Sequence, residues 1–317
     1  MNQPLVSVII PNYNHAPYLT QRIESVLNQT YQDFEVIILD DKSTDNSRDI
    51  IEQYRNHPKV SHIIYNEENS GSTFKQWKKG IELAKGEWIW IAESDDWCEP
   101  VFLENLVSLT NKYPSAGLAY CQSLLYNEAQ NTISPATSIS KIEDFISKEH
   151  YLSEKLIPFC SLINASMAIF RKELYHLVSP EYKNYRLAGD WIFWAEISQQ
   201  ADVIISGKYH NYFRQHDIKV SMNSLKEGSN YPEELKALAY FKTHFSIPEE
   251  HYNNAIIKHY MRFKYSKFPF NPGIVEKTEL LFRNSFNPEV EKKIKKETLK
   301  NRLLYRTIPK YLNLFFK

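Results

Sequence analysis

The sequence predicts an α/β protein, with a mostly parallel sheet flanked by helices and an all-helical C-terminal region after it. Two observations indicate this fold class. Short β-branched runs alternate with segments of helical periodicity over residues 5–126, as in βαβ units. Beyond about Ser224 only helical periodicity remains. We therefore expect an α/β domain over 1–224 and a helical region over 225–317.

Four strands are predicted early in the chain, with helices between them. The run LVSVII (5–10) is apolar and stops at Pro11, which predicts a buried strand. Leu19, Ile23 and Val26 then recur at helical spacing and predict an amphipathic helix. The later apolar runs predict strands at 34–40, 60–65 and 87–92, with helices that end near Tyr54 and span 73–84.

The remaining elements are predicted in the same way. They are a helix at 100–112, strands at 118–126 and 166–170, a helix from Asp190, strands at 203–205 and 209–214, and helices at 233–244, 249–267, 275–285 and 290–305. Residues 128–165 carry no clear periodicity.

Composition excludes several classes of protein. The eight glycines are never spaced as in dinucleotide-binding or Walker motifs. The three cysteines lack C-x-x-C spacing, which argues against a disulfide framework or a zinc site and fits a reducing cytoplasm. No signal peptide or membrane span is predicted. The net charge is zero, yet the first 100 residues hold nine basic and sixteen acidic side chains, and residues 290–317 hold nine and two.

Two acidic loops follow predicted strands, where parallel sheets bind their ligands. Glu93, Asp95 and Asp96 follow the fourth strand. Their mutual repulsion favours a bound Mg²⁺ or Mn²⁺ completed by phosphate oxygens, although a solvated turn that starts the next helix is the alternative. Asp40 and Asp41 end the second strand. They could cap the next helix or accept the ring N–H of a pyrimidine base.

Two single residues have a structural and a functional interpretation. Asp190 precedes the helical run WIFWAEI, so it could be an N-cap; near a helix N-terminus its carboxylate would be ionised and able to accept a hydroxyl proton. His216 has two interpretations. It is a surface or packing residue, or it is a metal ligand if a metal lies beside it.

Four ordered segments of this chain resemble the family 2 glycosyltransferases, which have the GT-A fold. The segments are VSVIIPNYN, SVLNQTYQDFEVIILDDKSTDNS, NSGSTFKQWKKGIELAKGEWIWIAESDDW and AGDWIFWAEI, and the resemblance covers about residues 4–220. It implies transfer of a sugar from a nucleoside diphosphate sugar to a hydroxyl, with inversion at the anomeric carbon.

The resemblance also implies roles for individual residues. Pro11 and Asn14 match the wall that receives the base and ribose, and Asp41 matches the position that binds the uracil N–H. Asp95 and Asp96 match the D-x-D-type element that meets ribose and metal, with Glu93 as a competing member of the acidic pair. Asp190 matches the catalytic base, and His216 a further metal ligand.

We interpret the chain as a metal-dependent, UDP-sugar-type glycosyltransferase acting on a glycan or lipid-linked acceptor. Lys75 could contact the diphosphate or belong to a solvated helix face. The alternatives are a sugar-nucleotide-binding protein without transferase activity and a sugar nucleotidyltransferase, although the latter's glycine-rich, arginine-containing loop is missing after the first strand.

The basic, aromatic segment 291–317 could lie in an anionic membrane interface or pack on the protein. Its charges accompany no recognised nucleic-acid motif, so nucleic acid is not expected as a partner. We therefore expect a cytoplasmic protein, which would reach the inner face of the membrane peripherally under the first of these two interpretations.

Overall fold

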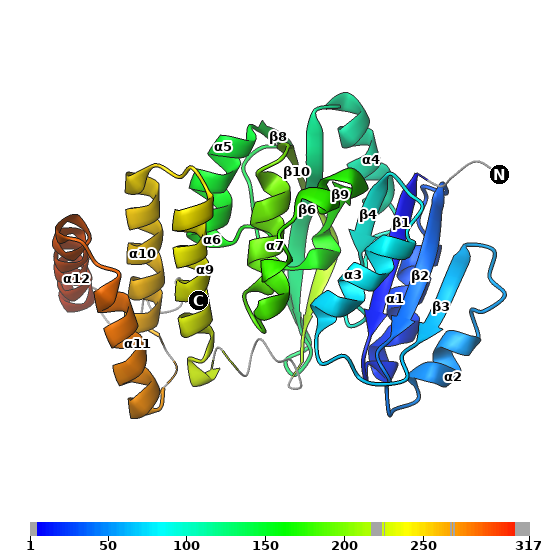
Figure 1. The fold of residues 1–317 in the computed structure, drawn as a ribbon, viewed down its shortest axis with the longest axis horizontal. Coiled ribbons are helices and arrows are strands. Elements are labelled where there is room, and N and C mark those ends of the chain that lie inside the picture. The colour runs from blue at the N-terminus through cyan, green and yellow to red at the C-terminus, as the bar shows by residue number, and fades with distance from the viewer. Residues whose placement is uncertain (1–4, 217–223, 225, 267, 269, 308–317) are drawn as a thin grey trace. The chain divides into compact units, whose positions relative to one another are not determined.

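The computed structural model describes residues 5–216, 224, 226–266, 268 and 270–307, and its ribbon is drawn in Figure 1. The chain forms two compact units, one of residues 1–156 and 160–223 and the other of residues 157–159 and 224–317. The first contains a sheet with helices packed on it, and the second contains helices. The predicted α/β class and the C-terminal helices are confirmed.

The sheet of the first unit has the strand order β3-β2-β1-β4-β9-β6-β10-β5, with β7 beside β6 and β8 beside β10. The strands are β1 (Val6–Asn12), β2 (Phe34–Asp40), β3 (Val60–Tyr65), β4 (Trp88–Ile91), β5 (Trp97–Cys98), β6 (Ala116–Asn127), β7 (Thr132–Pro135), β8 (Glu143–Ile146), β9 (Ala168–Arg171) and β10 (Asp202–Gln215). The first four strands of this order are parallel, whereas β9 is antiparallel to both β4 and β6. The carboxyl ends of β1, β2 and β4 therefore meet at one edge.

Helices cover this sheet. They include α1 (Ala16–Leu27), α2 (Ser47–Glu52), α3 (Thr73–Leu83), α4 (Phe102–Lys112) and α7 (Gly189–Ser198). Helices α1, α3 and α4 each carry an apolar face, whereas α7 is buried on nearly all sides. Helix α3 packs on β1 and β2, α4 on β6 and β10, and α7 on β6. Every residue of β1, β2 and β4 is buried, as expected for parallel strands covered on both faces.

The structure differs from the sequence prediction around β10. The two strands predicted at 203–205 and 209–214 are one strand whose pairing with β6 shifts register between Ile205 and Tyr209. Gly207 lies at this irregularity, where an added Cβ would sit 2.1 Å from the carbonyl oxygen of Lys141. The close backbone approach explains both the glycine and the interrupted pattern.

The unassigned stretch 128–165 folds into short elements rather than one long helix or strand. It contains β7, β8, α5 (Lys148–Tyr151), a π-helical turn over Leu152–Leu156 and α6 (Ile157–Phe159). Elements of three to five residues are too short to show a period.

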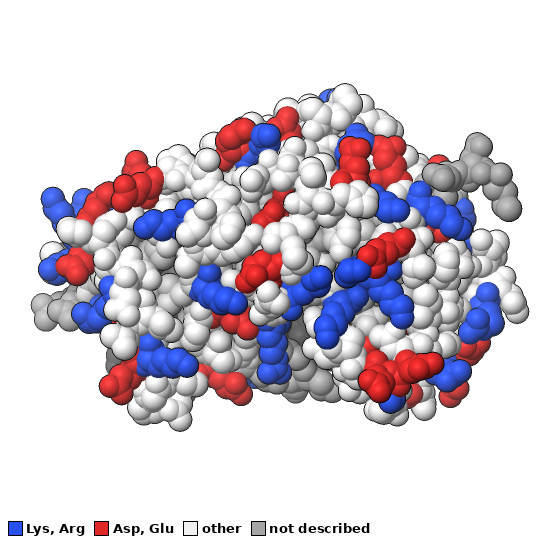
Figure 2. Space-filling view, in the orientation of Figure 1, with Lys and Arg blue, Asp and Glu red and all other residues white. Residues whose placement is uncertain are grey.

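The second unit is built from α9 (Asn230–His244), α10 (Glu249–Lys264), α11 (Pro272–Asn284) and α12 (Pro288–Thr307), with α6 packed against α10. Leu238, Phe241, Ala255, Ile256 and Phe282 are at most 1% exposed and form its core. No helix among the described residues is long and apolar enough to cross a bilayer. Acidic and basic side chains are interspersed over the face of the described residues that Figure 2 shows.

Candidate active site

The loop after β1 is fastened to the loop after β2. Pro11 is buried within β1, opposite Leu39. Asn14 has a φ of +54°, a region that asparagine tolerates better than most residues. Its backbone N–H donates to Ser43 Oγ at 2.9 Å, and its side-chain oxygen accepts the Thr44 N–H at 2.7 Å. Asn14 therefore joins the two loops.

The structure separates the two carboxylates that end β2. Asp40 accepts hydrogen bonds from Asn12 Nδ2 and from the backbone and hydroxyl of Ser43, so it holds the turn. Asp41, only 5% exposed, accepts from Asn66, Ser70 and Gln76.

These hydrogen bonds bear on the helix-capping interpretation of the doublet. Helix α2 begins after Asn46, and the partners of Asp41 lie in the β3–α3 loop and in α3, so capping of α2 does not explain Asp41. Three donors reach its Oδ1 and one reaches its Oδ2. A carboxylate has about four lone-pair sites, two on each oxygen, so Oδ2 retains acceptor capacity.

Lys75 lies on the first turn of α3 and is exposed. Its Nζ donates to the carbonyl oxygen of Ser70 at 2.9 Å. The ammonium group therefore lies beside the same loop that surrounds Asp41.

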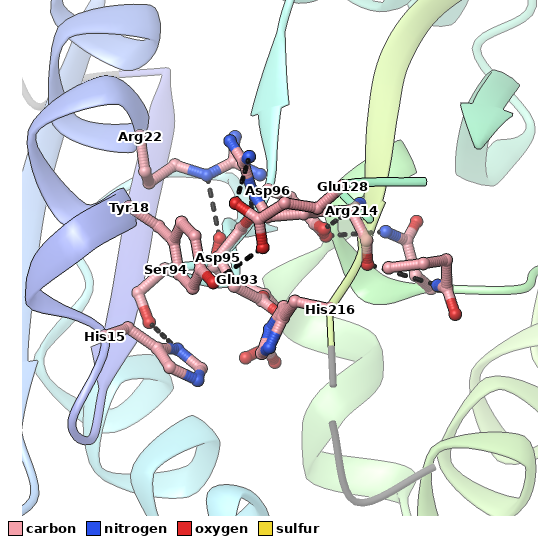
Figure 3. A network of polar contacts seen from close by, with 12 residues as sticks. His15, Tyr18, Arg22, Glu93, Ser94, Asp95, Asp96, Glu128, Arg214 and His216 are labelled. Atoms are coloured by element: carbon pink, nitrogen blue, oxygen red, sulfur yellow. Dashed lines mark hydrogen bonds and ion pairs between the residues drawn. The ribbon is translucent and has the colours of Figure 1, made fainter. Parts of the chain in front are cut away.

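The acidic loop after β4 gives each of its three acids a different environment, as Figure 3 shows. Glu93 Oε1 accepts the indole N–H of Trp77 at 2.8 Å. Asp96 is 1% exposed and is held by Asn164 Nδ2, Ser166 Oγ and the Arg214 N–H at 2.6, 2.8 and 3.0 Å.

Asp95 contacts the end of β10 instead. Its Oδ2 lies 3.2 Å from His216 Nε2, and both residues are buried, at 5% and 7% exposed. The structure thus brings together Asp95 and His216, two of the three predicted metal ligands. The third, Asp96, instead anchors the loop through its hydrogen bonds to Asn164, Ser166 and Arg214.

A third residue, His15, completes a group that could hold a cation. One ligand atom from each of His15, Asp95 and His216 lies within 4.8 Å of the others. His216 Nδ1 is buried and has no hydrogen-bond partner among the described residues. Two imidazoles and a carboxylate are metal-binding groups, so the residues present fit a divalent ion.

Two arginines hold the acidic loop through its backbone. Arg22 of α1 is fully buried and donates from Nε to the carbonyl oxygen of Glu93 at 2.8 Å. Arg214 donates from Nε to the carbonyl oxygen of Asp95 at 2.8 Å, and its guanidinium carbon lies 4.6 Å from the ring centroids of both Tyr18 and Trp97.

The phenol of Tyr18 donates to Glu128 at 2.9 Å. Burial and this hydrogen bond raise the pKa of Tyr18 to about 12, so the phenol remains a donor at neutral pH.

Sequence reasoning missed His15, Arg22 and Arg214. His15 lies three residues beyond the end of β1, so the rule that ligands bind at the carboxyl ends of strands pointed to its loop. Arg22 and Arg214 carried no local signal, because their partners are 71 and 119 residues away in the chain.

Asp190 lies in the first turn of α7, and the N-cap of that helix is Ala188. Asp190 Oδ1 accepts the N–H of Trp191 at 2.7 Å, so the N-cap interpretation is wrong in detail. The preceding Gly189 permits a close approach, because an added Cβ would lie 2.4 Å from Phe74 Cε2 and from the carbonyl oxygen of Tyr182.

Trp77 connects α7 to the acidic loop. Its ring makes an edge contact with Phe193 of α7, with ring centroids 5.3 Å apart, while its N–H binds Glu93. This packing links the helix that carries Asp190 to the acidic loop.

A parallel half-sheet with acidic, cation-compatible loops at its carboxyl edge, followed by an antiparallel strand, is typical of GT-A proteins. Solved structures agree with this fold. The chain matches Staphylococcus aureus TarS 1-349 in complex with UDP-GlcNAc with a TM-score of 0.63 and 20% identity, over 83% of this chain and 73% of that one. It matches the mannosyltransferase PcManGT from Pyrobaculum calidifontis, solved with GDP-Man and Mn²⁺, with a TM-score of 0.53 and 14% identity, over 94% of this chain and 81% of that one.

The family model described as glycosyl transferase family 2 matches residues 7–177, more than half of the chain. The chain belongs to this family. The glycosyltransferase GlyG of Streptococcus pneumoniae is 39% identical over 102 residues, which are 32% of this chain and 34% of GlyG. The chondroitin synthase of Escherichia coli is 37% identical over 132 residues, 41% of this chain and 19% of that protein. The chain thus matches these relatives over about a third of their length or less.

Proposed function

We propose that this chain is an inverting, metal-dependent glycosyltransferase that moves a sugar from a UDP-sugar to a hydroxyl of a glycan or lipid-linked acceptor. The observation that carries the proposal is the buried pair of Asp95 and His216, 3.2 Å apart at the carboxyl edge of the sheet, in a chain of this family.

The donor's uridine fits the edge formed by the loops after β1 and β2. Asp41 would accept the uracil N–H at Oδ2, while its other hydrogen bonds keep the carboxylate oriented. Pro11 and Asn14 would form the wall beside the base and ribose. Lys75 would supply a positive charge near the diphosphate.

Asp95 and His216 would hold a divalent cation, Mg²⁺ or Mn²⁺, whose chemistry is to neutralise charge on the departing diphosphate. Asp96 would contribute by fixing the loop, since Asn164, Ser166 and Arg214 already engage its carboxylate. Arg22 and Arg214 keep the loop backbone in place. Asp95, His216 and the residues that hold their loop would therefore bind and orient the donor.

Asp190 would act as the general base. It would take the proton from the acceptor hydroxyl while that oxygen bonds to the anomeric carbon and the bond from that carbon to the diphosphate oxygen breaks. Attack opposite the leaving group inverts the configuration. A second carboxylate acting as an acid is unnecessary, because a diphosphate whose charge is neutralised is a good leaving group without being protonated.

A thermal-shift panel of nucleotide sugars with and without Mn²⁺ tests the donor class. A ligand that binds only the folded state raises the melting temperature, so a UDP-sugar with Mn²⁺ should give a larger rise than GDP- or ADP-sugars. Incubation with a labelled donor and acceptor candidates then separates transfer from binding. Binding without transfer to any acceptor would favour a nucleotide-sugar-binding protein.

We further propose that segment 291–317 contacts an anionic membrane surface. Helix α12 carries Lys292, Lys293, Lys295 and Lys296 in its first half, and basic helices are attracted to anionic lipid. Residues 308–317, with Tyr311, Phe315 and Phe316, lie outside the described residues. Sedimentation with anionic vesicles should pellet the full chain more than a form that ends at Glu289; equal pelleting would refute this contact.

A further inference from the structure

We propose that His15 is a third protein ligand of the cation, and that the site consequently prefers a transition-series ion such as Mn²⁺ over Mg²⁺. This inference rests on the proposed function, because it takes the donor's cation as the occupant. It extends that function by naming a ligand from a different loop and by choosing between the two metals.

The geometry brings His15 to the other two ligands without a large rearrangement. Ligand atoms of His15, Asp95 and His216 lie within 4.8 Å of one another. With metal–ligand bonds of about 2.1 Å, adjacent ligands are about 3 Å apart and opposite ones about 4 Å. Small rotations of the side chains would therefore close the site. The imidazoles of His15 and His216 meet edge to face, with ring centroids 5.8 Å apart, and Figure 3 shows His15 below Ser94 on the α1 side.

The position of His15 is set by its backbone and by one side-chain hydrogen bond. Its carbonyl oxygen accepts the N–H groups of Tyr18 and Leu19, so it is part of the first turn of α1. Its Nδ1 lies 2.8 Å from Ser94 Oγ. A polar contact to one ring nitrogen is the type of outer contact that orients a ligating imidazole.

The donor set determines which metal is preferred. Mg²⁺ favours oxygen ligands, and imidazole nitrogen suits transition metals better. Two imidazoles and one carboxylate therefore disfavour Mg²⁺. Three protein ligands also leave coordination positions open for diphosphate oxygens, so this arrangement is compatible with donor binding.

Titration of the full chain with Mn²⁺ alone, followed by electron paramagnetic resonance of the free ion, tests the inference without nucleotide or acceptor. Wild type should bind Mn²⁺ at least about tenfold more tightly than Mg²⁺, measured by competition. His15→Ala should weaken Mn²⁺ binding by about tenfold or more and change Mg²⁺ binding less. His150→Ala, which removes an exposed imidazole on α5, is the control and should match wild type.

Electron spin echo modulation of bound Mn²⁺ counts directly coordinated nitrogens, which a general loss of stability would not change selectively. We expect two nitrogens in wild type, and one each in His15→Ala and His216→Ala. Ser94→Ala should weaken Mn²⁺ binding while retaining both nitrogens. One nitrogen in wild type, or equal Mn²⁺ affinity in His15→Ala, would overturn the inference.

The Mn²⁺ titration and the nitrogen count do not depend on sugar transfer. A His15→Ala variant that binds Mn²⁺ normally while the wild type transfers sugar would refute only the ligand assignment. Mn²⁺ binding through two nitrogens without any transfer would refute only the proposed function.

Discussion

The indole N–H of Trp77 donates to the Glu93 carboxylate at 2.8 Å and so ties helix α3 to the acidic loop after β4. Because the same ring packs against Phe193 of α7, one side chain contacts both elements that carry the proposed donor and base residues. The relative position of these two elements therefore depends on Trp77.

Trp77→Phe keeps an aromatic ring and removes this donor. We expect a free energy of unfolding lower by about 1 kcal/mol, since a half-buried carboxylate loses a hydrogen bond, together with weaker Mn²⁺ binding. Urea unfolding and metal titration measure the two effects. Trp88→Phe, an equal change of ring on β4, should destabilise the protein without weakening Mn²⁺ binding; identical behaviour of both variants would contradict the link to Glu93.

Asp190→Asn tests the proposed base. The amide retains the size of the side chain but cannot accept the acceptor's proton, so kcat should fall by about 10²–10⁴-fold while the donor still binds. Kinetics and donor-induced thermal shift measure the two quantities. Glu173→Gln, an exposed change, serves as the control. Undiminished turnover in Asp190→Asn would eliminate this residue as the base.

Asp41→Asn tests recognition of the base. The amide nitrogen would face donors from Asn66, Ser70 or Gln76 and would no longer offer two carboxylate oxygens. We expect UDP affinity to fall by about tenfold or more, with little change in affinity for inorganic diphosphate. Calorimetric titration compares the two ligands. An equal loss for both would point to collapse of the loop rather than loss of base recognition.

Glu35→Gln should change the acid stability of the first unit. Burial alone would raise the pKa of Glu35, but hydrogen bonds from Ser7, Ser61 and the Lys85 N–H outweigh it and lower the pKa below 4.5. A lowered folded pKa means that the carboxylate stabilises the fold above about pH 4.5 and loses this contribution as the pH falls through the folded value. Wild type should therefore lose more stability than Glu35→Gln between pH 5 and pH 3, and the variant should be the less stable of the two at pH 7. An equal change with pH in the free energy of unfolding of the two proteins, measured by urea unfolding, would contradict the assignment.

Gly189→Ala tests the entry to α7. The added methyl group would meet the backbone carbonyl of Tyr182, which cannot rotate away, as well as Phe74. We expect about 1–3 kcal/mol of destabilisation from overpacking and a loss of kcat, because Asp190 is the next residue. Gly273→Ala, where the nearest atom is 3.4 Å from an added Cβ, is the matched control.

The sequence predicted the strands β1 to β4 closely, because each is a short apolar run between polar loops, and β1, β2 and β4 are wholly buried. It could not predict that β9 is antiparallel between β4 and β6, since strand direction depends on connections across residues 128–165. Those residues form elements too short for any periodicity to be visible.

The local sequence pattern also identified the acidic loops, but not which contacts each acidic side chain makes. Asp95 and Asp96 are adjacent in sequence, yet one contacts His216 and the other Asn164 and Ser166. Their partners are between 68 and 121 residues away. Such choices are made by tertiary packing, which residue spacing does not encode.

Residues 157–159 group with the helical unit although the chain on both sides of them belongs to the other unit. The polypeptide therefore passes between the units three times rather than once, at 156–157, 159–160 and 223–224. A truncation that ends the chain near residue 224 would remove helix α10, against which α6 packs, and leave Ile157, which is fully buried, without this partner. The helical unit is therefore not formed by one continuous stretch of the chain, and a truncation at residue 224 would divide the residues that build it.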